Sequence, residues 1–335
     1  MSHTIYTQVL IVGGGVTGTG LARDLALRGL DCVLVDRKDI NAGASGANHG
    51  LLHSGARYVA SDPAAARECR IEAETLKRLA PQCVEDTGGL FVAVKGDDEA
   101  YIAEFADRCR RCGIIATPVD LREALEMEPC LSTDIGAAFS VADASVDPFK
   151  LSLDNLAQAR SLGSRYLMHH QVCGFKRHGS RIETAVLHDQ QSGREVRIVA
   201  DQIVNATGAW AGTVAAIAGA RIDMIYSQGT LIISQMRLGE RVINRLRKAA
   251  DADILVPAGT VSIFGTTSRR IKDPDGCRPT TAEIDAMLDD GISMVPKLAD
   301  TRFIRAYAGV RPLVKTGAGN DDRAVSRGFA LLDHE

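Results

Sequence analysis

The chain carries near its start the stretch Gln8-Val-Leu-Ile-Val-Gly13-Gly-Gly15-Val-Thr-Gly18, which decides the fold. The largely apolar run Gln8–Val12 predicts a buried β-strand. The glycines after it have the spacing G-x-G-x-x-G, and Thr19–Arg28 then carries apolar residues at helical spacing. A second apolar run follows at Asp31–Val35. Strand, glycine turn, helix and strand in this order predict the first βαβ unit of a Rossmann-like domain.

Each glycine of this unit has a physical role in binding a dinucleotide. Gly13 permits a tight turn, Gly15 lets the backbone approach a pyrophosphate, and Gly18 lets helix and strand pack closely. The phosphates then face the N-terminus of the helix, where free N–H groups and the helix dipole favour anions. Asp36 lies 18 residues after Gly18, where its carboxylate is placed to accept hydrogen bonds from an adenosine ribose.

The residues after Asp36 favour FAD over a nicotinamide cofactor. Residues 41–50 form a loop of small side chains that is rich in backbone donors. Such a loop is suited to wrap a long ligand that continues past the pyrophosphate, whereas a nicotinamide enzyme more often proceeds directly to its next βα unit. The alternative, a flexible surface loop, fits less well because His49, Leu51 and Leu52 are less polar than a linker requires.

A distant segment supports the same cofactor. Val199–Val204 predicts a strand that delivers Ala206-Thr-Gly208 toward the dinucleotide, and Ala211–Ala218 after it predicts a helix. The tripeptide is short and common, so its weight comes from the strand before it. Trp210, the only tryptophan, is by residue type more often a packing residue than a functional one.

Composition limits the class of protein. The 335 residues predict about two domains, and a hydrophobic content of 45% supplies a sizeable core. The formal net charge of −3 and the absence of a basic stripe argue against nucleic acid as a partner. The uncharged window 202–220 contains Asn205 and three glycines, so it predicts a strand, a turn and a short helix rather than a membrane span.

The cysteines predict no metal site. Eight are present, and Cys109-Arg-Arg-Cys112 is the only C-x-x-C pair. A zinc or iron–sulfur site needs further ligands at matched spacing, and no second pair exists. We interpret the pair as two thiols on successive turns of a helix within Glu99–Cys112.

Besides the dinucleotide turn, six segments are distinctive: Gly43-Ala-Ser-Gly-Ala-Asn-His-Gly-Leu-Leu-His-Ser-Gly-Ala-Arg-Tyr58, Val146-Asp-Pro-Phe149, Asp251-Ala-Asp-Ile-Leu-Val-Pro257, Gly265-Thr-Thr-Ser268, Tyr307-Ala-Gly-Val-Arg-Pro-Leu313 and Val325-Ser-Arg-Gly328. Together they resemble the FAD-dependent glycerol-3-phosphate dehydrogenases, most of all the catalytic A subunit of the anaerobic, quinone-linked bacterial type. The family continues beyond the last residue of this sequence, so the resemblance implies a C-terminally truncated chain.

The resemblance implies oxidation of sn-glycerol 3-phosphate to dihydroxyacetone phosphate, with hydride transfer to FAD and electrons passed to a quinone. It further implies iron–sulfur and membrane partner proteins and a cytoplasmic position, peripheral on the inner membrane. The cofactor-binding residues expected on these grounds are Gly13, Gly15, Val16, Thr17, Gly18, Asp36, Arg37, Ala44, Ser45, Asn48, His49, Gly50, Leu51, Val172, Ala206, Thr207, Gly208 and Trp210.

If the substrate is a phosphorylated polyol, its charge indicates which residue types should bind it. A dianionic phosphate favours arginine, whose fork makes two parallel charge-assisted bonds. Arg57 and Arg311 lie among small or apolar neighbours, unlike most surface arginines, and the resemblance adds Tyr58 and Arg327 as substrate-binding residues. His53, four residues before Arg57, is the predicted general base, and His49 is the alternative. The expected catalytic set is therefore His53, Arg57 and Arg311.

The predicted fold is α/β with an α+β substrate region. We expect a Rossmann-like FAD-binding domain of the glutathione-reductase/D-amino-acid-oxidase type, discontinuous over 1–80, 140–220 and 303–335. Residues 81–139 and 221–302 are expected to form a mixed-sheet substrate domain.

Two other functions fit the same residues. One is a flavin oxidase or dehydrogenase of an amino acid or a 2-hydroxy acid, because arginine binds carboxylate as well as phosphate. The other is a non-catalytic FAD-binding fragment.

Overall fold

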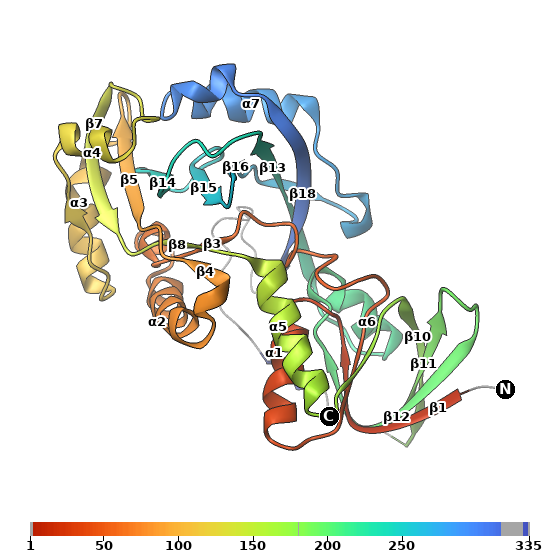
Figure 1. The fold of residues 1–335 in the computed structure, drawn as a ribbon. Coiled ribbons are helices and arrows are strands. Elements are labelled where there is room, and N and C mark those ends of the chain that lie inside the picture. The colour runs from red at the N-terminus through yellow and green to blue at the C-terminus, as the bar shows by residue number, and fades with distance from the viewer. Residues whose placement is uncertain (1–2, 180, 316–330, 334–335) are drawn as a thin grey trace.

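The chain folds into three β-sheets surrounded by helices, as the computed structural model describes over residues 3–179, 181–315 and 331–333 (Figure 1). The first sheet has the strand order β10-β11-β12-β1-β2-β9. Its strands β12, β1, β2 and β9 are parallel, and β10, β11 and β12 are antiparallel to one another in turn. The bounds are β1 (His3–Val12), β2 (Cys32–Val35), β9 (Arg165–Leu167), β10 (His170–His178), β11 (Arg181–Asp189) and β12 (Glu195–Asn205).

Successive side chains of β1 point to opposite faces of the six-stranded sheet and pack into two hydrophobic clusters. Val9 and Ile11 pack in one cluster with residues of α1 (Val16–Leu27) and α5 (Pro148–Ser161), which lie side by side in Figure 1. Leu10 and Val12 point to the other face and pack with residues of β10, β11 and β12. Successive side chains of a strand face opposite sides, so a continuous apolar run is buried on both.

The second sheet has nine strands. Its order is β17-β13-β16-β15-β14-β5-β7-β6, and β18 pairs with β13 beside this path. The bounds are β5 (Gly89–Val94), β6 (Thr117–Pro118), β7 (Ile135–Val141), β13 (Met224–Ser234), β14 (Val242–Arg245), β15 (Ile254–Ala258), β16 (Val261–Gly265), β17 (Arg269–Ile271) and β18 (Phe303–Val314). Most neighbours are antiparallel, and β14 and β5 are parallel, so the sheet is mixed.

A small sheet and the remaining helices complete the described chain. The small sheet contains β3 (Leu51–Leu52), β8 (Ala144–Val146) and β4 (Val84–Glu85). The other α-helices are α2 (Pro63–Leu79), α3 (Glu99–Arg111), α4 (Leu121–Met127), α6 (Ala211–Ile217) and α7 (Thr281–Gly291). Short 3₁₀ helices are η1 (Ala56–Tyr58), η2 (Pro81–Cys83), η3 (Gly208–Trp210), η4 (Pro274–Gly276) and η5 (Pro296–Asp300). Within the described ranges, none of the helices combines the length and apolarity needed to cross a bilayer.

The predicted fold class is confirmed, and the strand at residues 303–314 adds a detail to the proposed domain division. The α/β sheet around β1 and the mixed second sheet are both present. Residues 303–314, however, form β18, which pairs with β13 from Met224 to Ser234 and so belongs to the nine-stranded sheet. The sequence did not indicate this pairing, because pairing between strands so distant in sequence leaves no local signal. The domain division remains a proposal.

Candidate active site

The turn after β1 requires glycine at its first and last positions. Gly13 has φ +114°, and a Cβ built on it would lie 2.5 Å from the carbonyl oxygen of Ala206. A Cβ on Gly18 would lie 1.9 Å from the carbonyl oxygen of Gly13. The turn is therefore compressed between the start of α1 and the segment that follows β12, where Ala206 donates its N–H to the Val12 carbonyl over 2.8 Å.

The N-terminus of α1 is open to an anion. Its N-cap is Gly15, which has no side chain to cap the helix, and no acidic residue lies in the first turn. Ser45, from the loop of residues 41–50, accepts a hydrogen bond from the Val16 N–H at its Oγ over 2.9 Å. Thr17 lies in the same exposed turn. Ordinary helices carry a polar or acidic side chain at the N-cap itself, so a glycine N-cap that follows a glycine turn is suited to phosphate.

Asp36 lies at the end of β2 and faces back toward this turn. Its Oδ2 accepts from the Gly14 N–H over 2.6 Å, and its Oδ1 accepts from the Lys38 N–H over 2.7 Å. The hydroxyl of Tyr166 on β9 is buried near both residues, and within the described chain it has no hydrogen-bond partner. Burial raises the pKa of Tyr166, and the nearby Asp36 carboxylate raises it further, so this hydroxyl stays protonated as a donor.

Arg37 and Trp210 lie together, although the sequence does not indicate their contact. The guanidinium of Arg37 lies over the indole ring, 4.6 Å from its centroid. Asp275 in η4 accepts from the indole Nε1 over 3.1 Å and pairs with Arg37. The ring also packs against Gly43, where a Cβ would lie 3.1 Å from it. Trp210 therefore packs three segments together, as its residue type suggests.

The loop of residues 41–50 is held by the side-chain amide of Asn48 and by a hydrogen bond from β18. Asn48 donates to the carbonyls of Ala44 and Ser45 over 3.2 and 2.8 Å, and its Oδ1 accepts from the Gly50 N–H. Gly50 has φ +66°, a conformation that favours glycine. The hydroxyl of Tyr307 on β18 donates to the Asn48 carbonyl over 2.7 Å. The wrapping loop predicted from the sequence is therefore ordered by specific contacts.

Most of the predicted substrate residues converge beside this loop. The ring of His53 lies 6.1 Å from that of His49 and 5.3 Å from that of Tyr58. Burial, together with the positive charges of Arg57 and Arg311, lowers the pKa of His49 to about 3. His49 is therefore neutral at ordinary pH.

The two arginines are oriented by different partners. Arg57, whose side chain is 12% exposed, pairs through Nη2 with the fully buried Asp253 over 2.9 Å. Arg311 on β18 donates to Thr266 Oγ1 and to the Thr267 carbonyl. Its guanidinium lies over Gly229 on β13, where a Cβ would come within 2.7 Å of Nη2. A side chain at that position would displace the arginine.

The segment that carries His53 is also fixed. The Ser54 N–H donates to Asp143 Oδ1 over 2.6 Å, and Asn244 donates to Asp143 Oδ2 over 3.0 Å. Gly55 has φ +94°, and a Cβ on it would lie 2.1 Å from the Ala66 carbonyl oxygen. Because a buried carboxylate costs free energy unless it is hydrogen-bonded, Asp143 serves to hold this segment.

Some predicted residues lie elsewhere or outside the description. The side chain of Val172 packs in the core below the six-stranded sheet, so only its backbone is available to a ligand. Leu51 forms part of β3 and pairs with β8. Thr207 donates to Asn205 Oδ1, and Gly208 begins η3. Arg327 lies outside the described residues.

Sequence reasoning missed Asp143, Tyr166, Asp253 and Asp275. The only available signal was for Asp253, which lies in one of the segments that carry the family resemblance. The C-x-x-C pair is in α3 and its C-cap, with both thiols buried. Within the described part of the chain, no group of three or more His, Cys, Asp or Glu side chains is placed to hold a metal ion.

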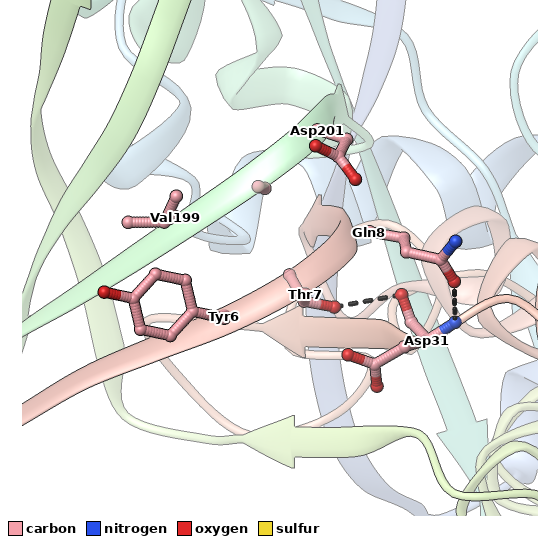
Figure 2. Close-up of a pocket in the computed structure, with 7 residues that line it drawn as sticks. Tyr6, Thr7, Gln8, Asp31, Val199 and Asp201 are labelled. Carbon is pink, nitrogen blue, oxygen red and sulfur yellow. Dashed lines mark hydrogen bonds between the residues drawn. The ribbon is translucent and has the colours of Figure 1, made fainter.

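A hollow beside the middle of β1 and β12 and the start of β2 is not part of this site. It has a volume of about 330 Å³ and is lined by Tyr6, Thr7 and Gln8 of β1, Asp31 before β2, and Val199, Ala200 and Asp201 of β12 (Figure 2). Thr7 donates to the Asp31 carbonyl, and Gln8 accepts from the Asp31 N–H. The dinucleotide turn lies instead where β1 and β2 end, the edge at which ligands bind in such sheets.

Fold and site together define a flavin-binding oxidoreductase. A family model described as FAD dependent oxidoreductase matches residues 8–332, and the chain belongs to this family. It is 44% identical over 330 residues to the A subunit of anaerobic glycerol-3-phosphate dehydrogenase from Escherichia coli (strain K12), with 98% of the chain and 61% of the relative covered. It is 43% identical to the A1 subunit of the same enzyme from Haloferax volcanii, with 98% and 58% covered. The resemblance found in the sequence is confirmed, and the chain spans about three fifths of the length of these relatives.

A solved structure supports the fold. L-alpha-glycerophosphate oxidase from Mycoplasma pneumoniae with FAD bound superposes with a TM-score of 0.78 at 20% identity, covering 93% of this chain and 84% of that one. FAD is the cofactor of the family. The described residues fit it, because the buried Tyr166 hydroxyl beside the glycine turn and the buried Nδ1 of His49 have no hydrogen-bond partner within the described chain, and Gly15 offers no side chain to cap α1.

Proposed function

We propose that this chain forms the FAD and substrate site of a glycerol-3-phosphate dehydrogenase, which oxidises sn-glycerol 3-phosphate to dihydroxyacetone phosphate. The observation that carries the proposal is the placement of two arginines around the neighbouring rings of His49 and His53. Arg57 lies in η1 beside Tyr58, whose ring contacts that of His53, and Arg311 lies on β18, whose Gly309 contacts Ala47 of the loop that carries His49. The curated relatives that share over two fifths of its residues are named for this substrate.

The arginines bind the phosphate of the substrate. Two guanidinium groups match the two negative charges of a phosphate monoester, and each offers N–H groups in a planar fork. The ring of Tyr58 lies against that of His53, so we propose Tyr58 as a further substrate-binding residue. Arg327 is also expected to bind the substrate. The neutral state of His49 keeps a third positive charge away from the two arginines, whose mutual repulsion the dianion relieves.

His53 is the proposed general base. It accepts the proton of the substrate hydroxyl, a role for which imidazole titrates in the right range. The hydrogen bond from Ser54 to Asp143 holds the backbone beside it. FAD, when bound, supplies the acceptor for the hydride that the alcohol carbon loses.

The electrons are proposed to continue to a quinone. The relatives are named as the A and A1 subunits of an enzyme, which supports the presence of partner proteins in this system as well. We infer that iron–sulfur and membrane partners receive the electrons and place the chain at the cytoplasmic face of the inner membrane.

The test uses the full-length protein with bound FAD under anaerobic conditions. Bleaching of the flavin absorbance is followed after mixing with sn-glycerol 3-phosphate, glycine, sarcosine or 2-hydroxyglutarate. The proposal expects rapid bleaching with glycerol 3-phosphate and formation of dihydroxyacetone phosphate. Bleaching by a carboxylate substrate alone would favour an amino-acid or 2-hydroxy-acid oxidase, and no bleaching by any of them would favour a non-catalytic FAD-binding role.

A further inference from the structure

The carboxylate of Asp253 organises the surroundings of Arg57. Its Oδ2 accepts from Arg57 Nη2 over 2.9 Å and from the Ala250 N–H over 2.6 Å. Its Oδ1 accepts from Arg247 Nε over 2.8 Å. The side chain of Asp253 is fully buried, so both oxygens are fixed by protein donors rather than by water.

A row of ion pairs continues from Asp253 away from Arg57. Arg247 also pairs with Asp290 in α7, and Asp290 pairs with Arg245 on β14. Arg245 in turn pairs with Asp97 over 2.7 Å. The row therefore alternates three arginines with three aspartates from Asp97 to Arg57 and carries no net charge.

Arg57 is the last member of this row and keeps one nitrogen available. Nη2 is committed to Asp253 and to the Ala250 carbonyl. Nη1 is buried and has no hydrogen-bond partner among residues 3–179, 181–315 and 331–333. Arg57 is in η1 beside Tyr58, whose ring lies 5.3 Å from that of His53, so this end of the row lies beside the candidate general base.

We propose that Asp253 is a positioning residue that fixes one side of the Arg57 fork so that Nη1 faces the site and binds the phosphate of the substrate. This rests on the proposed function only for the identity of the anion. An arginine held on one edge has already lost its rotational freedom, so less entropy is lost when the anion binds.

The test measures binding of inorganic phosphate to the full-length, FAD-loaded protein by its perturbation of the flavin spectrum. Asp253→Asn removes the charge and places an amide donor against one of the two arginines. We expect the dissociation constant for phosphate to rise at least about tenfold. The matched control is Asp97→Asn, which breaks an equally buried pair with Arg245 that does not touch Arg57; it is expected to change the constant less than about twofold.

A double-mutant cycle separates positioning from a general loss of structure. If Asp253 acts through Arg57, then Asp253→Asn adds little to the weaker binding of Arg57→Ala. Additive effects, equal effects of Asp253→Asn and Asp97→Asn, or no phosphate binding by the wild type would each overturn the proposal.

A second variant applies where Asp253→Asn does not fold. Arg57→Lys keeps the positive charge beside Asp253 but loses the fork, so phosphate binding should again weaken at least about tenfold. Unchanged binding would overturn the proposal. Failure of glycerol 3-phosphate to reduce the wild-type flavin is a separate result that contradicts the proposed function alone, because the phosphate measurement needs no turnover.

Discussion

The hydroxyl of Tyr307 donates a hydrogen bond to the backbone carbonyl of Asn48 over 2.7 Å. This contact joins the last strand of the nine-stranded sheet to the loop that follows the dinucleotide turn. Two residues further along β18, a Cβ on Gly309 would lie 2.2 Å from the Ala47 carbonyl oxygen, so strand and loop are in direct backbone contact. β18 and the loop of residues 41–50 therefore hold each other in place.

Tyr307→Phe should weaken FAD binding about fivefold, since one hydrogen bond contributes about 1 kcal/mol. Burial raises the pKa of Tyr307 to about 12, so the hydroxyl remains a donor at neutral pH. Titration of the FAD-free chain with FAD, followed by flavin fluorescence, measures the affinity. Tyr6→Phe, at a residue 69% exposed on β1, is the control and should change nothing. Equal affinity of Tyr307→Phe and wild type would contradict the loop's dependence on this contact.

Gly13→Ala and Gly20→Ala form a second matched comparison within the same strand–turn–helix unit. Gly13 has a positive φ and no room for a Cβ, so Gly13→Ala should weaken FAD binding at least about tenfold. Gly20 lies inside α1, and a Cβ there meets only Asn155 at 3.9 Å. Gly20→Ala should therefore stabilise the chain by about 0.5–1 kcal/mol against urea and leave FAD binding intact. Similar losses of FAD affinity in both variants would show that the turn geometry is not the cause.

These residues show how much the sequence alone could predict. The dinucleotide turn is a local pattern, since Gly13, Gly18 and Asp36 lie within one βαβ unit. The structure has a tight turn at the two glycines, with the Asp36 carboxylate hydrogen-bonded to it, and the role of these residues in binding FAD stays a prediction. The grouping of His53 with Arg57 was also visible, because both lie in one short segment.

The sequence did not indicate which distant residues contact the site residues. Asp253 meets Arg57 across 196 positions of the chain, and Tyr307 meets Asn48 across 259. Such contacts depend on how β13, β15 and β18 are ordered in the sheet, and each strand by itself is compatible with several orders. For the same reason the sequence did not indicate that β18 pairs with β13, because this pairing is a property of the whole sheet.

His49 predicts a specific dependence of stability on pH in the FAD-free chain. Its folded-state pKa of about 3 is below the unfolded value of 6.5, so the unfolded chain binds a proton that the folded chain rejects. The stability from the neutral imidazole is complete above pH 6.5 and falls as the pH decreases toward 3. From this residue, the free energy of unfolding should be at most about 2 kcal/mol lower at pH 5 than at pH 7.

His49→Asn removes that titration and serves as the comparison. Urea denaturation of both proteins at pH 5, 6, 7 and 8 isolates the difference, because all other groups are shared. The variant should show a flatter curve below pH 6.5. Parallel curves would mean that His49 is protonated normally in the folded chain.

Arg311 provides the most direct test of the central claim, which is that two arginines bind the phosphate of the substrate beside FAD. The measurement is the rate of anaerobic flavin reduction by subsaturating sn-glycerol 3-phosphate in the full-length protein, comparing wild type with Arg311→Met. Arg305→Met, on an exposed position of the same strand, is the control. We predict rapid reduction in the wild type and control and a rate roughly a hundredfold lower in Arg311→Met. No reduction of the wild-type flavin, or equal rates in all three proteins, would contradict the claim.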